Sequence, residues 1–167
     1  MNSDPAATAA FTGHRTYDGS ADEALRRTVC ELHASGVRTF LSGMAVGFDL
    51  AAAEAVLACR QTIPDMRLVA VVPFREQASR FPPRDRERYD RILAAADERV
   101  VLSEGFYRGC YAVRNDYLVE HASRLVAWYD GSPGGTRYTV RRAERKGRRI
   151  IHLHPDAPTT PMQAELF

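Results

Sequence analysis

The sequence predicts a single α/β domain built on a doubly wound, mostly parallel sheet with helices on both faces. Short apolar segments alternate with helical patterns along the whole chain, an arrangement typical of parallel sheets. Residues 67–72 are β-branched and nearly all apolar, as expected of a strand covered on both faces. Polar, glycine-bearing clusters follow the predicted strands. They therefore share the carboxyl edge of the sheet, where such folds bind ligands.

The first half of the chain supplies three of the expected strands, at residues 6–12, 39–41 and 67–72. A capping box, Ser20 with Glu23 three residues later, predicts the start of the first helix, and Gly36 predicts its end. Residues 49–59 are rich in alanine and predict a buried helix, with Asp49 at its N-cap.

The second half predicts a polar helix at 84–96 and strands at 99–102, 125–128 and 150–153. Further helices are expected through residues 114–119 and over 136–146, the latter stopping at Gly147. The chain, residues 1–167, is thus expected to be one domain with a core at about 6–154. Residues 155–167, with three prolines, are expected to be a loosely held end.

Composition excludes several classes of protein. The apolar share of 45%, the charged share of 26% and the net charge of +2 are those of an ordinary folded domain. Lys146 is the only lysine, which argues against a lysine nucleophile or a P-loop lysine. Three cysteines, Cys30, Cys59 and Cys110, are far apart in sequence and predict buried, reduced thiols, with neither a disulfide framework nor a metal site. We expect a cytoplasmic protein without a membrane span or an export signal.

Residues 42–49, SGMAVGFD, are the stretch around which the chain is organised. They join a predicted strand to a predicted helix, where glycines let the backbone approach a ligand and the helix amides attract phosphate or carboxylate. The spacing matches neither the ordinary dinucleotide fingerprint nor a Walker loop. The alternative is a tight turn whose glycines serve packing only.

Four further clusters occupy equivalent positions, at residues 12–15, 73–77, 107–116 and 130–136. Because parallel strands end at one edge, all five clusters should converge on one crevice. The predicted ligand-binding residues are Gly13, His14, Arg15, Ser42, Gly43, Gly47, Asp49, Phe74, Gln77, Arg114, Asn115, Asp130, Gly131, Gly134, Gly135 and Thr136.

A phosphorylated ligand is the simplest occupant of this crevice. Two glycine turns before helices form anion cradles, and the guanidinium groups of Arg15 and Arg114 suit phosphate bidentately. Asp49 and Asp130 are candidates to accept ribose hydroxyls, with a helix cap and a turn as their respective alternatives. The aromatic residues that would stack on a base, or else belong to the core, are Phe74, Tyr107 and Tyr111.

No catalytic group is fixed by the residue pattern. Candidates for a water-activating carboxylate are Asp49, Glu54 and Asp130, but their spacing defines no pair. His14 is a candidate ligand donor or general acid, or else a backbone partner at a turn.

Several segments in order resemble the SLOG superfamily, and most of all its YpsA-like branch. They are FTGHR at 11–15, SGMAVGFDLAAAEAV at 42–56, VVPFREQ at 71–77, RGCYAVRNDYLV at 108–119 and AWYDGSPGGTRYTVRRA at 127–143. The resemblance implies a Rossmann-like domain whose strand-end loops bind a nucleotide or a nucleotide-derived ligand such as ADP-ribose. It implies no certain cofactor and no metal.

Two other branches suggest alternative functions. Lonely Guy phosphoribohydrolases, which cut an N-glycosidic bond in nucleotides, carry a PGGxGTxxE loop. Residues 133–136 match it in part, but the loop is one residue shorter and Thr139 stands where the glutamate is expected. The DNA-processing protein DprA carries an SGxAxGID loop, similar to residues 42–49, and an RNR segment whose second arginine is Asp116 here.

Nucleic acid is a second possible partner, less favoured than a small nucleotide. Basic residues recur on the last predicted helix and beyond it, at spacings that form a stripe able to follow a phosphate backbone, and the alternative is a solvated face. They are Arg137, Arg141, Arg142, Arg145, Lys146, Arg148 and Arg149. A homodimer is expected on general grounds.

Overall fold

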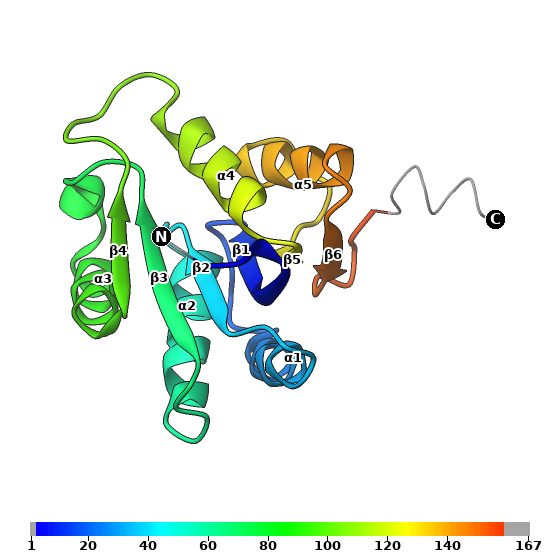
Figure 1. Ribbon diagram of the computed structural model, residues 1–167. Helices are drawn as coiled ribbons and strands as arrows, with labels where there is room; N and C mark the ends of the chain where they lie inside the picture. Colours follow the sequence, from blue (N-terminus) through cyan, green and yellow to red (C-terminus); the bar gives the residue numbers. More distant parts are fainter. Residues whose placement is uncertain (1–2, 159–167) are drawn as a thin grey trace.

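The computed structural model describes residues 3–158 and shows one sheet with helices on both faces (Figure 1). Six strands, counted over this range, all run parallel in the order β4-β3-β2-β1-β5-β6. They are β1 (Thr8–Gly13), β2 (Thr39–Ser42), β3 (Arg67–Val72), β4 (Glu98–Val101), β5 (Arg124–Trp128) and β6 (Arg149–His152). The predicted α/β class and Rossmann-like architecture are confirmed.

The chain reverses its direction across the sheet next to β1. From β1 it steps outward through β2 and β3 to β4, then crosses back to β5, which pairs with the other side of β1. Gly13 at the end of β1 is level with Trp128 at the end of β5. In open parallel sheets the crevice beyond such a reversal is the usual place for a ligand.

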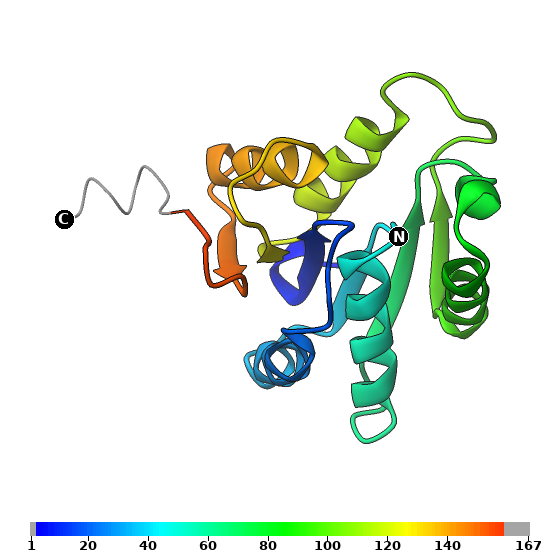
Figure 2. The ribbon, with the colours of Figure 1, turned by 180° about the vertical axis from the view of Figure 1, so that it is seen from behind.

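The helices divide between the two faces as this path requires. Contacts join α1 (Asp22–Ala34), α2 (Phe48–Arg60) and α3 (Pro83–Ala95) in one layer, and α4 (Cys110–His121) with α5 (Gly135–Arg145) in the other. Figures 1 and 2 show the two layers on opposite sides of the sheet. Each helix begins near the carboxyl edge of the sheet, so all five helix N-termini lie on the side of the strand-end loops.

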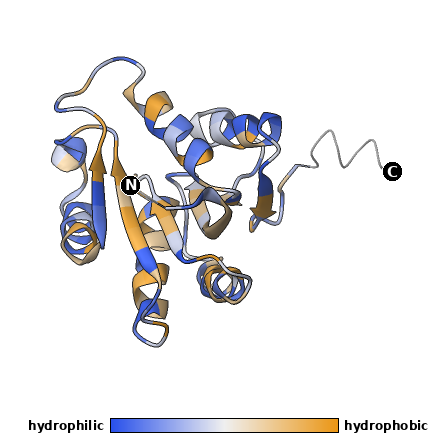
Figure 3. Cartoon of the chain, in the orientation of Figure 1, coloured by the Kyte–Doolittle hydropathy of each residue, from blue (hydrophilic) through white to orange (hydrophobic). Residues whose placement is uncertain are grey.

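Both faces of the sheet are buried. One core contains Phe11, Phe40 and Phe48 under α1–α3, and the second contains Leu41, Leu118 and other residues under α4 and α5. In Figure 3 the apolar colour runs along most of β3. Burial on both faces explains why the central strands are continuously apolar instead of alternating.

Two predicted helix starts are wrong. The capping box at Ser20 does not form: α1 begins at Asp22 with Ala21 as its N-cap, and no side chain caps it. The Tyr17 hydroxyl takes that place, accepting a hydrogen bond from the Ala21 amide while it donates to Asp22. Asp49 is not an N-cap either, because α2 begins one residue earlier, after Gly47.

The predicted strand at 67–72 matches β3 at both ends, and the helix expected through 114–119 lies within α4, which begins at Cys110. The other predicted bounds differ from the structure by at most two residues. β1 begins at Thr8 because a short 3-10 turn, Pro5–Ala7, precedes it. A second 3-10 turn, Gln77–Arg80, follows β3. Of the predicted loose end, residues 159–167 lie outside the described residues. No helix within residues 3–158 has the length and apolarity that a membrane crossing requires.

Candidate functional site

The carbonyl group of Gly43 is the centre of the strand-end crevice. Arg114 donates from Nη1 to this oxygen, and Gln77 donates from Nε2 at 3.1 Å. Both side chains are buried, each with 6% of its surface exposed, although they come from α4 and from the turn after β3. Three of the five predicted clusters therefore meet at one backbone oxygen.

Arg114 also faces a buried carboxylate. Asp49, in the first turn of α2, is 6% exposed and accepts a hydrogen bond from the Ala45 amide at 3.3 Å. Burial raises the pKa of Asp49 to about 6, although the charge of Arg114 and the Ala45 N–H act in the opposite direction. Burial likewise lowers the pKa of Arg114, and Asp49 opposes that change. The site thus holds two interacting charges away from water.

The loops that surround this pair are closely packed. Gly47 has φ of +93°, and a Cβ there would lie 2.5 Å from the backbone oxygen of Arg15. A Cβ on Gly43 would lie 2.9 Å from Cδ and Nη1 of Arg114, and one on Gly13 would overlap the Phe48 ring. Contacts within the protein therefore constrain all three glycines, and for Gly43 and Gly47 this is the packing role considered as an alternative for residues 42–49.

Asn115 connects Arg114 to the second glycine turn. Its Oδ1 accepts from Nε of Arg114 at 2.7 Å, and its Nδ2 lies 3.6 Å from where a Cβ of Gly135 would stand. Gly134, at φ of +139°, precedes α5, and Thr136 is buried in the first turn of that helix. One dipeptide of α4 therefore lies between the N-terminal ends of α2 and α5, the two predicted anion cradles.

An aromatic cluster borders the same residues. Phe74 packs edge-to-face against Phe106 and Tyr111, with ring centroids 5.6 and 6.0 Å apart, and Cζ of Arg114 lies 5.8 Å from the Tyr111 centroid. Phe74 is buried and belongs to the core, whereas Phe106 is 66% and Tyr111 is 46% exposed. Phe106 belongs to the β4–α4 connection, which Figure 1 shows projecting beyond the sheet, and Tyr111 lies in the first turn of α4. Tyr107 is also exposed and has no ring contact in this cluster within residues 3–158.

His14 and Asp130 form a separate contact where β1 and β5 end. His14 Nε2 lies 2.8 Å from Asp130 Oδ1 and 3.1 Å from the Asp130 amide, so the nitrogen can donate to the first or accept from the second. Asp130 Oδ1 also accepts from the hydroxyl and the amide of Ser132, which lower the Asp130 pKa to about 2. The turn-forming alternative for Asp130 therefore holds, and the residue is ionised at neutral pH.

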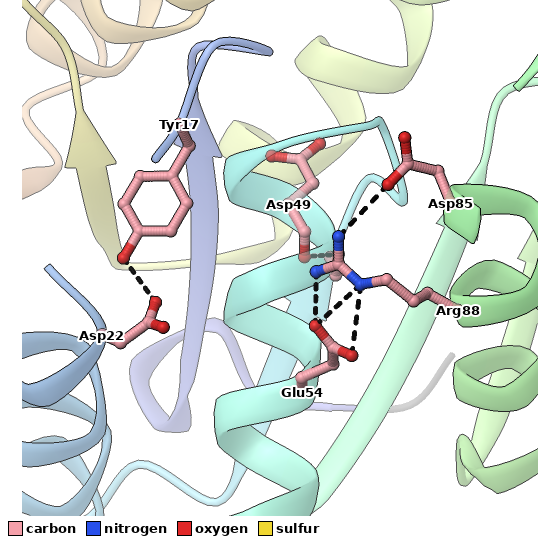
Figure 4. A network of polar contacts seen from close by, with 7 residues as sticks. Tyr17, Asp22, Asp49, Glu54, Asp85 and Arg88 are labelled. Carbon is pink, nitrogen blue, oxygen red and sulfur yellow. Dashed lines mark hydrogen bonds and ion pairs between the residues drawn. The ribbon is translucent and has the colours of Figure 1, made fainter. Parts of the chain in front are cut away.

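Glu54 points elsewhere. It pairs with Arg88 of α3, which also contacts Asp85 at 3.2 Å (Figure 4). Glu54 and Arg88 line a charged cleft of about 850 Å³ between α1, α2 and α3, and Tyr17 and Asp22 line the same cleft. This ion-pair network was not predicted from the sequence, although Asp85 and Arg88 stand at the i, i+3 spacing of a helical ion pair.

The three candidate carboxylates thus have different partners. Asp49 interacts with Arg114 and the Ala45 amide, Glu54 pairs with Arg88, and Asp130 contacts His14 and Ser132. Arg15, also predicted at the site, has an exposed side chain with no hydrogen bond or ion pair in the described range, and only its backbone contacts Gly47. Within residues 3–158, no group of three or more His, Cys, Asp or Glu side chains is arranged to hold a metal ion.

The predicted basic stripe is partly neutralised. Arg142 pairs with Asp116 and Glu120, and Lys146 also pairs with Glu120. Two more of the set are engaged with backbone oxygens, Arg137 with Gly131 and Arg148 with Val119. The basic side chains of the stripe without a hydrogen bond or ion pair in the described part of the chain are Arg141, Arg145 and Arg149.

A family model and several known sequences match most of the chain. The model of the YspA SLOG family (YpsA) matches residues 11–153. UPF0398 protein BH1768 of Halalkalibacterium halodurans is 33% identical over 127 residues, which is 74% of this chain and 67% of that protein. The matched range contains every residue predicted at the site.

Two solved structures share the fold. DNA processing protein A of Streptococcus pneumoniae superposes with a TM-score of 0.66 at 18% identity, over 94% of this chain and 52% of that one. The chain thus spans about half of that protein's length. DNA processing protein A of Helicobacter pylori, described for its single-stranded DNA binding mode, gives a TM-score of 0.63 at 16% identity, over 95% and 67%. At these identities the likeness concerns the fold alone.

Proposed function

Because the chain belongs to the YspA SLOG family, we propose that it binds a nucleotide or a nucleotide-derived phosphate ester, such as ADP-ribose, at the carboxyl edge of its sheet. The observation that carries the proposal is the position of Arg114 and Asn115 between two glycine turns at helix N-termini. The phosphate lies against the amides that begin α5, beside Asn115 Nδ2. The buried guanidinium of Arg114 contributes a positive charge beside Asn115.

The cost of this arrangement supports a ligand role. Burying a guanidinium and a carboxylate costs several kcal/mol per ion unless charge and hydrogen bonds compensate, and apolar side chains of similar size often replace such pairs without loss. The charge of Asp49 opposes the burial cost of Arg114, but the two side chains share no hydrogen bond or ion pair among the contacts of the described residues. A bound phosphate would supply the missing negative charge.

The base of the ligand lies against the exposed aromatic residues. Phe106 and Tyr111 present ring faces and edges to solvent on the α4 side of Arg114. An aromatic base stacked there buries apolar surface that is otherwise wet, and the stack is tolerant of base identity.

Single-stranded nucleic acid is the second candidate ligand. The same exposed aromatic residues and the unpaired Arg141 and Arg145 favour it, as does the shared fold with a protein described for single-stranded DNA binding. The neutralised stripe on α5 weighs against it, because a backbone-tracking surface needs unpaired cations.

The proposal includes binding and no reaction. The position where phosphoribohydrolases carry a glutamate holds Thr139, which is fully buried and donates to the Gly135 carbonyl at 2.8 Å. Among the described residues, the three candidate carboxylates have separate partners, so none of them forms the acid and base pair that hydrolysis of an N-glycosidic bond employs.

A thermal-shift screen tests the proposal. The purified protein is heated with AMP, ADP, ATP, NAD, ADP-ribose, ribose 5-phosphate or an oligo-dT strand, and co-purifying molecules are identified by mass spectrometry. A ligand at 100 times its dissociation constant adds about 2.7 kcal/mol, which raises the midpoint by about 5 °C or more. A shift with a nucleotide, abolished by Gly43→Ala, is the expected result. Binding of oligo-dT alone, falling steeply with salt, supports the second candidate, and no shift with any probe refutes both.

A further inference from the structure

The packing of α1 against α2 brings together two cysteines that are 29 residues apart in sequence. Sγ of Cys30 lies 3.6 Å from Sγ of Cys59, and both residues are free thiols. Cys59 donates in turn to the Arg26 carbonyl, at 3.8 Å. The expectation of buried, reduced thiols holds for Cys59, whereas Cys30 is reduced but only partly buried, and its sulfur atom lies against that of Cys59.

The pair is also accessible. A shallow pocket of about 430 Å³ on the outer surface of α1 and α2 is lined by both cysteines, with Arg26 and Arg27 beside them. The third cysteine, Cys110, is 1% exposed and lies on α4, on the opposite face of the sheet. Solvent and a small oxidant thus reach the partly exposed Cys30 through this pocket, which Glu23 also lines.

We propose that Cys30 and Cys59 form a redox-modification site that a hydroperoxide closes to an intramolecular disulfide between α1 and α2. The inference is independent of the proposed ligand. Closure shortens the Sγ separation from 3.6 Å to about 2.05 Å, which side-chain rotation in two directly packed helices supplies.

The chemistry requires only the two thiols and the peroxide. The Cys30 thiolate attacks the peroxide O–O bond, forms a sulfenic acid and releases an alcohol or, from hydrogen peroxide, water. The Cys59 sulfur then attacks the Cys30 sulfur, and the hydroxyl leaves as water with the Cys59 proton. Two thiols lose two electrons and two protons in total, and one peroxide is reduced. Burial and the contact with Cys30 raise the pKa of Cys59 to about 11, which leaves the more exposed Cys30 as the thiol that attacks the peroxide.

The disulfide has a structural consequence. It ties the C-terminal end of α2 to α1, closing a loop that is otherwise open in the unfolded chain. We expect the oxidised protein to melt about 5–10 °C higher than the reduced one.

Peptide mapping tests this proposal directly, because trypsin places each cysteine in its own peptide: residues 28–38, 39–60 and 109–114. The full-length protein is treated with hydrogen peroxide, its remaining thiols are alkylated under denaturing conditions, and it is digested without reductant. We expect a species joining residues 28–38 to 39–60, lost on reduction, absent from Cys30→Ser and Cys59→Ser, and retained in the matched control Cys110→Ser.

Other outcomes would overturn the assignment. Irreversible oxidation of Cys30 without a cross-link, a link that involves Cys110, or a disulfide found only in dimers on a non-reducing gel would each do so. None of these results bears on nucleotide binding, so failure here is distinct from failure of the proposed function.

Discussion

Two charged regions include residues of α2, and they differ in the exposure and the pairing of their arginine side chains. Arg114 is 6% exposed and faces Asp49 in the crevice, whereas Arg88 has a side chain 24% exposed and pairs with the 39% exposed Glu54 in the cleft of about 850 Å³. The cleft is roomy and its ions are well paired (Figure 4). In the crevice, by contrast, Arg114 and Asp49 are buried, and removing their charges from water costs free energy. A buried charge whose pairing is incomplete is therefore a better indicator of a ligand site in this protein than the volume of a cleft.

The largest expected effect separates the two arginines by stability. Arg114→Ala leaves Asp49 buried without its cation and removes two hydrogen bonds, so we expect a loss of about 3–5 kcal/mol in urea denaturation at pH 7. Arg88→Ala removes a partly exposed pair and should cost about 1 kcal/mol or less. Equal losses would erase the distinction between the two regions.

Glycine substitutions sharpen the comparison at the crevice loops. Gly47→Ala adds a Cβ 2.5 Å from the Arg15 backbone oxygen at a left-handed φ, and we expect a loss of about 3 kcal/mol. Gly36→Ala is the matched control, because its φ is +111° but a Cβ there meets nothing within 4 Å. That control should cost only about 1 kcal/mol, the left-handed strain alone. The urea midpoints of the two variants are compared, and equal midpoints would show that close packing of the Gly47 loop adds nothing to stability.

The pH dependence of stability tests the burial of Asp49. Its pKa rises from 3.8 to about 6 on folding, so the folded state holds the proton more tightly than the unfolded state. The contribution of Asp49 to unfolding free energy therefore falls as pH rises from about 4 to 6, by about 3 kcal/mol in all. The difference between the wild type and Asp49→Asn, measured by denaturation at several pH values, should follow this course. A difference that is constant with pH would contradict the burial.

The smallest effect concerns Glu54. Glu54→Gln breaks an ion pair that water already screens, and we expect a change of about 0.5 kcal/mol. Ligand binding at the crevice should be unaltered. A loss of binding would instead show that Glu54 contributes to the ligand site, although it pairs with Arg88 outside it.

The sequence predicted the sheet well because its signals are local. Apolar runs, glycine turns and alternation of strand and helix specify a parallel sheet, and the parallel order then brings Gly43, Gln77 and Arg114 to one edge. The predicted helix starts at Ser20 and Asp49 failed because other residues are the N-caps, Ala21 at α1 and Gly47 at α2. At α1 the Tyr17 hydroxyl accepts from the Ala21 amide and donates to Asp22, a contact that the capping-box pattern does not include.

The sequence pattern did not predict which side chains of different helices lie in contact. Cys30 and Cys59, like Glu54 and Arg88, meet only because α1, α2 and α3 pack in one layer, and neither pair has a short sequence spacing. Burial was equally unpredictable for Arg114, which stands in a polar segment yet lies beneath the loops. Among the predicted residues, Glu54 and the side chain of Arg15 lie apart from the Gly43, Gln77 and Arg114 contacts, and His14 forms a separate contact with Asp130.

The most direct test compares ligand affinity across the two regions. ADP-ribose and AMP are titrated calorimetrically into the wild type, Arg114→Lys, Asn115→Ala and Arg88→Ala, each first shown to be folded by circular dichroism. The account predicts that at least one of these nucleotides binds the wild type and Arg88→Ala alike. It also predicts that the affinity falls about tenfold or more in Arg114→Lys and Asn115→Ala, which lose the planar fork and the amide beside Gly135. Unchanged affinity in both crevice variants, or a loss confined to Arg88→Ala, would contradict it.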